Sequence, residues 1–383
     1  MKITSNHCTG CGACSVACPQ KCISMKENRL AEKKPIIDSS RCVSCKRCQQ
    51  ICPQNHPVPL NRPSQCYAAW SNNSQDWVYS SSGGAVMALS RVTLKHKGVV
   101  FGCDYTNTGN LEHFSGISEK DLQKFQSSKY SRSDAFPVFK RIKELVAGNT
   151  SVLFVGTPCQ VAGLKGYLGL DYPSLITVDL VCHGTPPNKY LLDHLRSIGI
   201  TPPYQSIRFR GKYDQKLTIV KDDVLVYQKD NNEDRFFKSF YNNSISYRSC
   251  YTCPYAGPLR VSDITVGDFW GLGQLKDTSK KKSERPSLIL VNTASGARFF
   301  EEASENLIFE NRSVSEGISG NGRLNNPPGE KIQAFTFRLF YPIIGFRLSC
   351  RMSEIIENLS HNLKRCKRKA IALIKQIIAH AYK

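Results

Sequence analysis

The sequence lacks several features that mark common classes of protein. No stretch approaches the 18 apolar residues that a membrane-spanning helix requires. The segment Met1 to His7 contains no apolar run of the kind found in secretory signal peptides. No GxGxxG fingerprint occurs, so a standard dinucleotide-binding half is not predicted. We therefore expect a cytoplasmic protein that does not span a membrane.

Acidic residues are scarce relative to basic ones. The 383 residues contain 52 Lys and Arg against 31 Asp and Glu, a formal charge of +21. The excess is largest in residues 323–383, with twelve basic residues against three glutamates. Such a tail favours acidic partners. We expect either peripheral contact of this tail with the inner face of a membrane or a helix packed on protein, and no nucleic acid as a partner.

Cysteine, in contrast, is abundant, with 17 residues. Eight of them form two copies of the run C-x2-C-x2-C-x3-C-P, which is typical of bacterial proteins with two [4Fe–4S] clusters. In such pairs of runs, three thiolates hold one cluster and the fourth, ahead of proline, crosses to the other. Zinc is the alternative, but a zinc ribbon would leave a thiolate of each run unused. The first cluster would take Cys8, Cys11, Cys14 and Cys52, and the second Cys42, Cys45, Cys48 and Cys18.

The fold class follows from these runs and from the texture of the rest of the chain. Residues 1–60 predict a bacterial dicluster ferredoxin fold, which belongs to the α+β class, and residues 61–77, rich in Pro, Asn and Ser, indicate a linker. Residues 78–345 alternate helix and strand patterns and predict an α/β flavin and iron–sulfur domain with a largely parallel sheet. Residues 346–383 predict a basic helical tail. The expected helices are 84–97, 139–147, 160–168 and 350–383, and the expected strands are 98–102, 151–155, 175–181, 217–227, 264–269 and 287–292.

Four further cysteines predict a third [4Fe–4S] cluster. Cys159 and Cys182 follow two buried strands, at the edge of a parallel sheet where cofactors gather. Cys250 and Cys253 form a CxxC pair that completes four ligands. The alternatives are ordinary buried cysteines with zinc at the CxxC pair, or Cys103 as a rival ligand. The cysteines expected to be unligated are Cys22, Cys66, Cys350 and Cys366.

Two polar segments could bind a flavin. Ser80 to Gly84 leads into a helix, where hydroxyls and glycine amides suit a pyrophosphate, although a plain N-cap explains the same residues. Ser127 to Arg132 supplies hydroxyls, two cations and the ring of Tyr130. Among the histidines, His183 is expected near a cofactor. Those expected at the surface are His7, His56, His96, His113, His361 and His380.

These residues resemble the beta subunit family of coenzyme F420 hydrogenases and dehydrogenases over most of residues 1–295. The motifs that carry the resemblance, besides the two cysteine runs, are Ser82-Gly83-Gly84, Ser128-Lys129-Tyr130, Gly156-Thr157-Pro158-Cys159-Gln160, Asp179-x-x-Cys182-His183-Gly184, Phe209-Arg210-x-Lys212, Cys250-x-x-Cys253 and Ser262-Asp263-x-Thr265-x-Gly267-Asp268-Phe269-Trp270-Gly271.

The resemblance implies FAD beside a [4Fe–4S] cluster that links the flavin to the ferredoxin pair. The side chains expected near FAD are Ser82, Gly83, Gly84, Ser128, Lys129, Tyr130, Thr157, Gln160, Lys212, Asp263 and Asp268. Within this set, Lys129 and Lys212 would bind phosphate or reduced flavin, and Asp263 or Asp268 would orient the cofactor. Arg132 and Glu284-Arg285-Pro286 depart from the family pattern, which leaves the hydride partner open.

The sequence therefore predicts an iron–sulfur flavoprotein oxidoreductase that passes electrons between clusters and FAD, with no side-chain nucleophile. Its partners would be a redox protein or a reduced deazaflavin or nicotinamide-type donor. Because the family includes bacterial members in surface-polysaccharide gene sets, that pathway is one expected setting. The alternative is a non-catalytic electron-transfer subunit that carries clusters only and feeds a partner enzyme.

Overall fold

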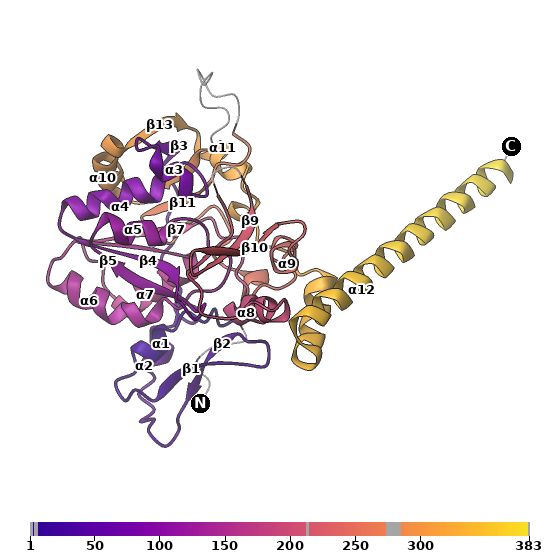
Figure 1. Cartoon of the computed structure of the whole chain (residues 1–383), viewed down its shortest axis with the longest axis horizontal. Coiled ribbons are helices and arrows are strands. Elements are labelled where there is room, and N and C mark those ends of the chain that lie inside the picture. Colours follow the sequence, from indigo (N-terminus) through magenta and orange to yellow (C-terminus); the bar gives the residue numbers. More distant parts are fainter. Residues whose placement is uncertain (1–2, 4–6, 212–213, 273–284, 382–383) are drawn as a thin grey trace.

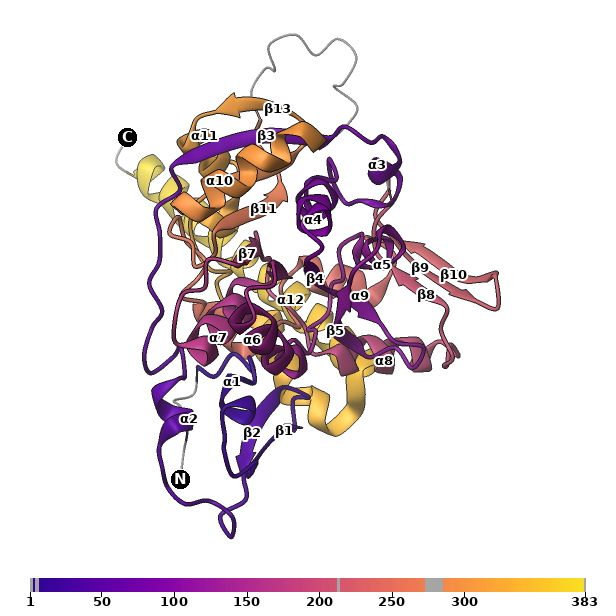
Figure 2. The same ribbon diagram turned by 90° about the vertical axis from the view of Figure 1, so that its left-hand side faces the viewer.

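The computed structural model describes residues 3, 7–211, 214–272 and 285–381, with side chains up to residue 360. Figure 1 shows an N-terminal unit at the base of the view, a large α/β body above it, and a long C-terminal helix that projects from the body. Figure 2 gives the same arrangement from the side, so the N-terminal unit lies under one edge of the body.

The N-terminal unit is an antiparallel hairpin with two short helices. Each helix begins inside a cysteine run, directly after a residue in the left-handed region: Gly12 (φ 75°) for the first and Lys46 (φ 60°) for the second. These turns bring successive cysteines of a run toward one side. The elements are α1 (Ala13–Val16), β1 (Ile23–Glu27), β2 (Lys33–Ile37) and α2 (Arg47–Gln50).

The body is built on one eight-stranded sheet in the order β13-β3-β12-β11-β7-β6-β4-β5. The pairs β11–β7, β7–β6 and β6–β4 are parallel and the other four are antiparallel, so the sheet is mixed around a parallel centre. The carboxyl ends of β6, β7 and β11 therefore share one edge. The strands are β3 (Gln65–Ser71), β4 (Val99–Tyr105), β5 (Leu111–Gly116), β6 (Val152–Gly156), β7 (Leu175–Leu180), β11 (Ile264–Asp268), β12 (Ser287–Val291) and β13 (Leu307–Arg312).

Strand β3 lies within residues 61–77, and here the structure differs from the expected linker. β3 pairs with β12 on one side and β13 on the other, and Ala68, Ala69 and Trp70 are at most 1% exposed. The strand is apolar on both faces and has no alternating pattern, because both faces of the sheet are covered. Its polar flanks hid it in the sequence. The helix α3 (Gln75–Tyr79) follows it.

Helices cover both faces of the sheet. On one face α4, α5 and α10 pack over Val100, Leu153 and Val178. On the other face α6 and α7 pack over Phe101 and Phe154. Neighbouring strand residues alternate between these two cores, as the pleat requires. The helices are α4 (Ala85–Lys95), α5 (Glu119–Phe125), α6 (Phe139–Ala147), α7 (Pro158–Leu168), α10 (Ala294–Ala303) and α11 (Val314–Ser319).

A second, three-stranded antiparallel sheet, β10-β9-β8, packs with α8 and α9 around a separate aromatic core. The single β pattern expected at 217–227 is a hairpin of two strands. Ala31, from the N-terminal hairpin, also packs in this core. The elements are α8 (Asn188–Ser197), β8 (Ser206–Arg208), β9 (Lys216–Lys221), β10 (Val224–Asp230) and α9 (Arg235–Tyr241).

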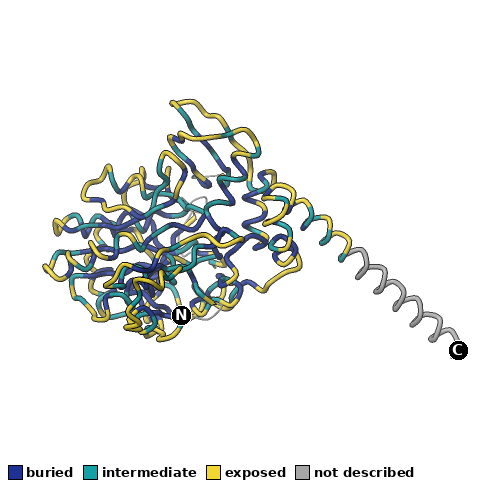
Figure 3. Tube along the Cα trace, turned by 90° about the horizontal axis from the view of Figure 1, so that it is seen from below, coloured by how far each residue is buried: buried dark blue, intermediate teal, exposed yellow. Residues whose placement is uncertain are grey.

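The last helix, α12 (Ile332–Ala381), begins earlier than the sequence suggested and bends at Gly345 (φ 73°). Phe337, Tyr341 and Phe346 pack it on the aromatic core around α8 and α9. Beyond that contact the helix leaves the body, as Figure 3 shows. In the part of the chain that the structure describes, no helix is both long and apolar enough to cross a bilayer.

Candidate metal centres and cofactor site

Two cavities in the N-terminal unit are each lined by one set of four cysteines. Cys8, Cys11, Cys14 and Cys52 line the first, with apolar neighbours such as Met25. Each set combines three cysteines of one run with the fourth of the other, which is the crossover expected from the runs. The second cavity is lined by Cys18, Cys42, Cys45 and Cys48, together with Cys22.

The thiols of the first cavity need a cation in order to ionise. Burial raises the pKa of Cys11 to about 12 and also raises the pKa of Cys8 and Cys14. Iron binding takes thiolates and would release these protons. Among the described residues, no three His, Cys, Asp or Glu side chains are arranged around a single metal ion.

Cys159 stands in the first turn of α7, which is fixed by local contacts. The N–H and hydroxyl of Thr157 donate to Oε1 of Gln160 (2.8 and 2.9 Å), and Pro158 occupies a position that needs no donor. Nε2 of Gln160 donates to the carbonyl and hydroxyl of Ser133 (both 2.9 Å). Thr157 and Gln160, expected near FAD, therefore hold the helix that carries Cys159.

Three further thiols share the buried region of Cys159. Gly184 (φ 108°) lies so near Cys250 that a Cβ on it would stand 3.6 Å from the Cβ of Cys250. The pKa of Cys182 is raised by burial and then by the charges of Cys250 and Cys159. Burial, with an added effect of Cys159, raises the pKa of Cys250 to about 11 and that of Cys253 to about 12. The structure thus brings together the four cysteines expected to hold a third cluster.

The rival ligand Cys103 lies in a different environment. Burial raises its pKa, and its nearest charged neighbours are Lys129, which lowers it, and Asp104. Cys103 sits on β4, next to the edge strand β5. We therefore keep Cys182, and not Cys103, in the third set.

Arg260, which was not singled out from the sequence, fastens the CxxC loop to the end of β7. It is 2% exposed, and its Nη2 donates to Asp179 (2.9 Å) and its Nη1 to the carbonyl of Tyr255 (3.0 Å). Thr265 donates to the same carboxylate (2.6 Å). Such hydrogen bonds offset the cost of desolvating a buried ion pair. A clue was Asp179 inside an otherwise apolar strand, because a buried carboxylate needs a cation.

The third cysteine set adjoins the N-terminal unit. Gly163, one turn after Cys159 on α7, packs on Cys11, and a Cβ on Gly163 would lie 3.0 Å from the Cys11 sulfur. Tyr255 lies nearby, since its pKa is raised by burial and then by Cys159, Cys11 and Cys253. Thiols of both sets therefore face one small region.

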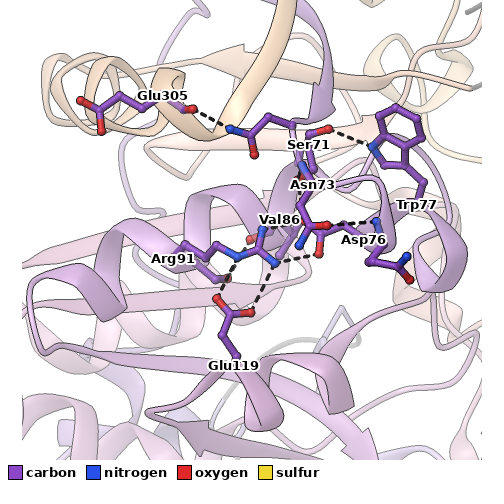
Figure 4. Close-up of polar contacts among 12 residues, drawn as sticks. Ser71, Asn73, Asp76, Trp77, Val86, Arg91, Glu119 and Glu305 are labelled. Atoms are coloured by element: carbon purple, nitrogen blue, oxygen red, sulfur yellow. Dashed lines mark hydrogen bonds and ion pairs between the residues drawn. The ribbon is translucent and has the colours of Figure 1, made fainter.

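The loop before α4 is shaped by a buried polar network, drawn in Figure 4. Asp76 is 3% exposed and accepts hydrogen bonds from Nη1 and Nη2 of Arg91 (2.6 and 2.8 Å) and from the hydroxyl of Ser71. Nε of Arg91 donates to Glu119 (2.8 Å). These contacts hold α3 against α4 and fix the loop between them.

Gly83 and Gly84 are required by packing. A Cβ on Gly83 would stand 2.2 Å from the carbonyl oxygen of Ala69 in β3. Gly84 is the N-cap of α4 and has φ 79°. The plain N-cap explanation therefore accounts for both glycines, while the amides and hydroxyls at this helix end remain suited to an anion.

The two segments expected to bind FAD lie side by side. The N–H of Ser128 donates to Oγ of Ser81 (2.8 Å), and the two hydroxyl oxygens are 2.7 Å apart. The hydroxyl of Ser82 is 2.8 Å from that of Ser287 on β12. A cluster of serine hydroxyls thus surrounds the start of α4.

A buried arginine, Arg210, completes this side of the molecule. Its Nη1 donates to Asp268 (2.6 Å) and lies 3.5 Å from the hydroxyl of Tyr130, while its carbonyl accepts from Ser127 (3.0 Å). Arg210 is 6% exposed, and within the described residues Nε and Nη2 have no hydrogen-bond partner. Two expected residues, Tyr130 and Asp268, therefore meet around a cation that was quoted in the family motif but not proposed as a contact.

Other expected contacts are engaged elsewhere. Nζ of Lys129 donates to the carbonyls of Lys124 and Gln126 at the end of α5 (3.0 and 2.7 Å), and burial lowers its pKa. The ring of Tyr130 stacks on Phe240 (4.4 Å between centroids). Lys212 lies outside the described residues.

Asp263 is placed away from these residues. It precedes β11, at the amino end of the strand, whereas Asp268 ends it. Its Oδ2 accepts from the N–H and hydroxyl of Thr177 (2.9 and 2.6 Å), and its Oδ1 accepts from Thr293 (2.8 Å). The proposed role of Asp263 in orienting a cofactor is corrected to a structural one, because both oxygens are engaged at the opposite edge of the sheet.

Two histidines also need comment. His113, expected at the surface, is 5% exposed, stacks on Phe154, and its Nε2 lies 3.0 Å from the Val155 carbonyl. Burial lowers its pKa to about 4. His183 lies beside Cys182, as expected, with Nε2 3.3 Å from the carbonyl of Tyr241.

Comparison with known proteins gives two family matches. Residues 149–316 match the family model for the C terminus of the coenzyme F420 hydrogenase/dehydrogenase beta subunit, and residues 7–56 match a 4Fe-4S dicluster domain. A similar solved chain belongs to the xenon-derivatised F420-reducing [NiFe] hydrogenase complex from Methanosarcina barkeri. It is 16% identical, with a TM-score of 0.46, and the match covers 68% of this chain and 91% of that one. No curated protein matches the sequence.

Proposed function

Since residues 149–316 belong to the coenzyme F420 hydrogenase/dehydrogenase beta subunit family and residues 7–56 form a 4Fe-4S dicluster domain, we propose that the chain is an iron–sulfur flavoprotein oxidoreductase. Two ferredoxin-type clusters, a third cluster and FAD would form one electron path. The single observation that carries this proposal is the convergence of Cys159, Cys182, Cys250 and Cys253 next to Cys11.

The donor set fits a third cluster. All four side chains are thiols, they lie in one buried region, and three of them have a raised pKa, so a polycationic iron cluster would satisfy them. Thr157 and Gln160 hold Cys159, and Arg260 holds the loop of Cys253. The proposed role of these residues is to keep the four sulfurs in place.

Flavin binding is supported by the residues at the carboxyl edge of the sheet. The serine hydroxyls at the start of α4 suit a pyrophosphate, and Arg210 has two buried N–H groups without a partner in the described chain. Arg210 and Asp268 would orient the flavin and stabilise its reduced form. When bound, FAD exchanges a hydride on one side and single electrons with clusters on the other.

The partners follow from this chemistry. A reduced deazaflavin or nicotinamide-type donor would supply hydride, and a redox partner protein would exchange electrons with the N-terminal unit. A cytoplasmic setting in surface polysaccharide biosynthesis stays part of the proposal.

Flavin content tests the proposal and separates it from the cluster-only adaptor. Protein purified without oxygen is expected to bind about one FAD per chain on titration. Arg210→Met should weaken FAD binding at least tenfold, because it removes a buried cation. Arg208→Met is the matched control, since Arg208 is exposed and stacks over Tyr79 (4.9 Å). No flavin binding by the wild-type protein would favour the adaptor.

A specific observation also supports peripheral membrane contact. Beyond its bend, α12 exposes Leu348, Ile355 and Leu359 by 43–57%, and the adjoining tail is basic in sequence. An apolar stripe beside cations suits an anionic bilayer surface. Full-length protein should float with anionic liposomes more than a chain ending at Ser360 or an Ile355→Glu, Leu359→Glu variant. Equal flotation by all three would contradict membrane contact and indicate a protein-packing role for the helix.

A further inference from the structure

Arg132 lies between the third cysteine set and the first cavity of the N-terminal unit. Its Nη1 donates to the sulfur of Cys159 (3.0 Å), and its guanidinium carbon is 5.6 Å from the centre of the Tyr247 ring. The hydroxyl of Tyr247 accepts from the N–H of Lys33 (3.1 Å), and a Cβ on Gly10 would lie 3.5 Å from the Tyr247 ring. Arg132 and Tyr247 together thus reach from Cys159 to the loop that separates the first two ligands of the first cavity.

The guanidinium is buried, charged and incompletely hydrogen-bonded. Arg132 is 7% exposed, and its Nη2 has no acceptor within the described residues. Burial acts to lower its pKa, but Cys159, Tyr247 and Cys250 raise it above its ordinary value, so the group stays cationic. A buried donor without a partner points to an acceptor that the protein itself does not supply.

The charge also acts on the first cavity. After burial and the nearer groups, Arg132 lowers the pKa of both Cys8 and Cys11. One fixed cation therefore influences thiols of two separate sets.

We propose that Arg132 is a positioning residue that raises the reduction potential of the cluster bound through Cys159 and couples this cluster to the first cluster of the N-terminal unit. The inference rests on the proposed third cluster. Reduction of a [4Fe–4S] cluster adds one electron and no proton. A cation hydrogen-bonded to a ligand sulfur stabilises the added negative charge, and Nη2 can donate to a second sulfur of the same cluster.

The test is a redox titration of the fully loaded protein, followed by electron paramagnetic resonance. Arg132→Met should lower the midpoint potential of the third cluster by at least a tenfold change in its reduction equilibrium, which is about 59 mV for one electron. The first cluster should shift less in the same direction, and the second should not shift. Arg132→Lys, which keeps the charge, should stay closer to the wild type. Arg312→Met, which removes an arginine paired with Glu316 on β13, should change no potential.

The outcomes separate this inference from the proposed function. Wild-type protein with only eight iron atoms would refute the third cluster itself, whereas twelve iron atoms with an unchanged potential in Arg132→Met would overturn the role of Arg132 alone. If Arg132→Met loses the third cluster, Arg132→Gln is measured in its place. Loss of the cluster in both neutral variants, with retention in Arg132→Lys, would make Arg132 an assembly residue and also overturn the inference.

Discussion

Gly163 on α7 packs directly against Cys11 of the N-terminal unit: a Cβ on Gly163 would stand 2.8 Å from the Cβ of Cys11 and 3.0 Å from its sulfur. The helix that carries Cys159 at its start therefore touches a proposed ligand of the first cluster one turn later. Only a glycine allows this approach between the two cysteine sets.

Gly163→Ala should therefore disturb the first cluster. The added methyl group cannot be placed unless Cys11 or α7 moves, and such overpacking costs about 1–3 kcal/mol of unfolding free energy. We expect an altered resonance signal of the first cluster and a lower urea midpoint.

Gly148→Ala is the matched control for that variant. Gly148 ends α6 with φ −85°, and a Cβ there would meet nothing nearer than 3.5 Å. A Gly163→Ala protein with the spectrum and stability of Gly148→Ala would contradict the close contact.

The pair Arg260–Asp179 predicts a large stability effect. Arg260→Met leaves Asp179, which is fully buried, without its cation and should destabilise the protein by about 3–5 kcal/mol. The double variant Arg260→Met, Asp179→Asn should be more stable than Arg260→Met alone, because no buried charge remains. Denaturant unfolding measures both. A double variant as unstable as the single one would show that packing, not charge, dominates.

Much of this arrangement was readable from the sequence, and the rest was not for physical reasons. The two runs gave the grouping of Cys52 with Cys8, because the proline-flanked fourth cysteine has a known crossover. The strand-end positions of Cys159 and Cys182 indicated their convergence, because parallel strands share an edge.

The sequence did not reveal three other features. β3 was missed, because a strand buried on both faces has no alternation and its flanks look like a linker. Arg260 and Arg210 were missed as functional residues, because burial and unfilled hydrogen bonds appear only in three dimensions. Asp263 was misplaced, because its motif does not tell the amino end of a strand from the carboxyl end.

The buried His113 predicts a pH dependence of stability. Its pKa is lowered by burial from 6.5 to about 4, so the unfolded chain binds a proton more readily than the folded one. Its contribution is complete above pH 6.5 and is lost as the pH falls toward 4, at up to about 1.4 kcal/mol per pH unit. Urea unfolding between these limits should show a shallower slope for His113→Gln than for the wild type. Equal slopes in the two proteins would mean that His113 is not the group that titrates.

Iron content per chain, measured after anaerobic reconstitution of the wild type, Cys159→Ser and Cys103→Ser, tests the central claim most directly. Three [4Fe–4S] clusters predict about twelve iron atoms in the wild type, about eight in Cys159→Ser with the ferredoxin-type signals intact, and about twelve in the control Cys103→Ser. About eight iron atoms in the wild type, or an unchanged content in Cys159→Ser, would contradict a third cluster at the edge of the sheet.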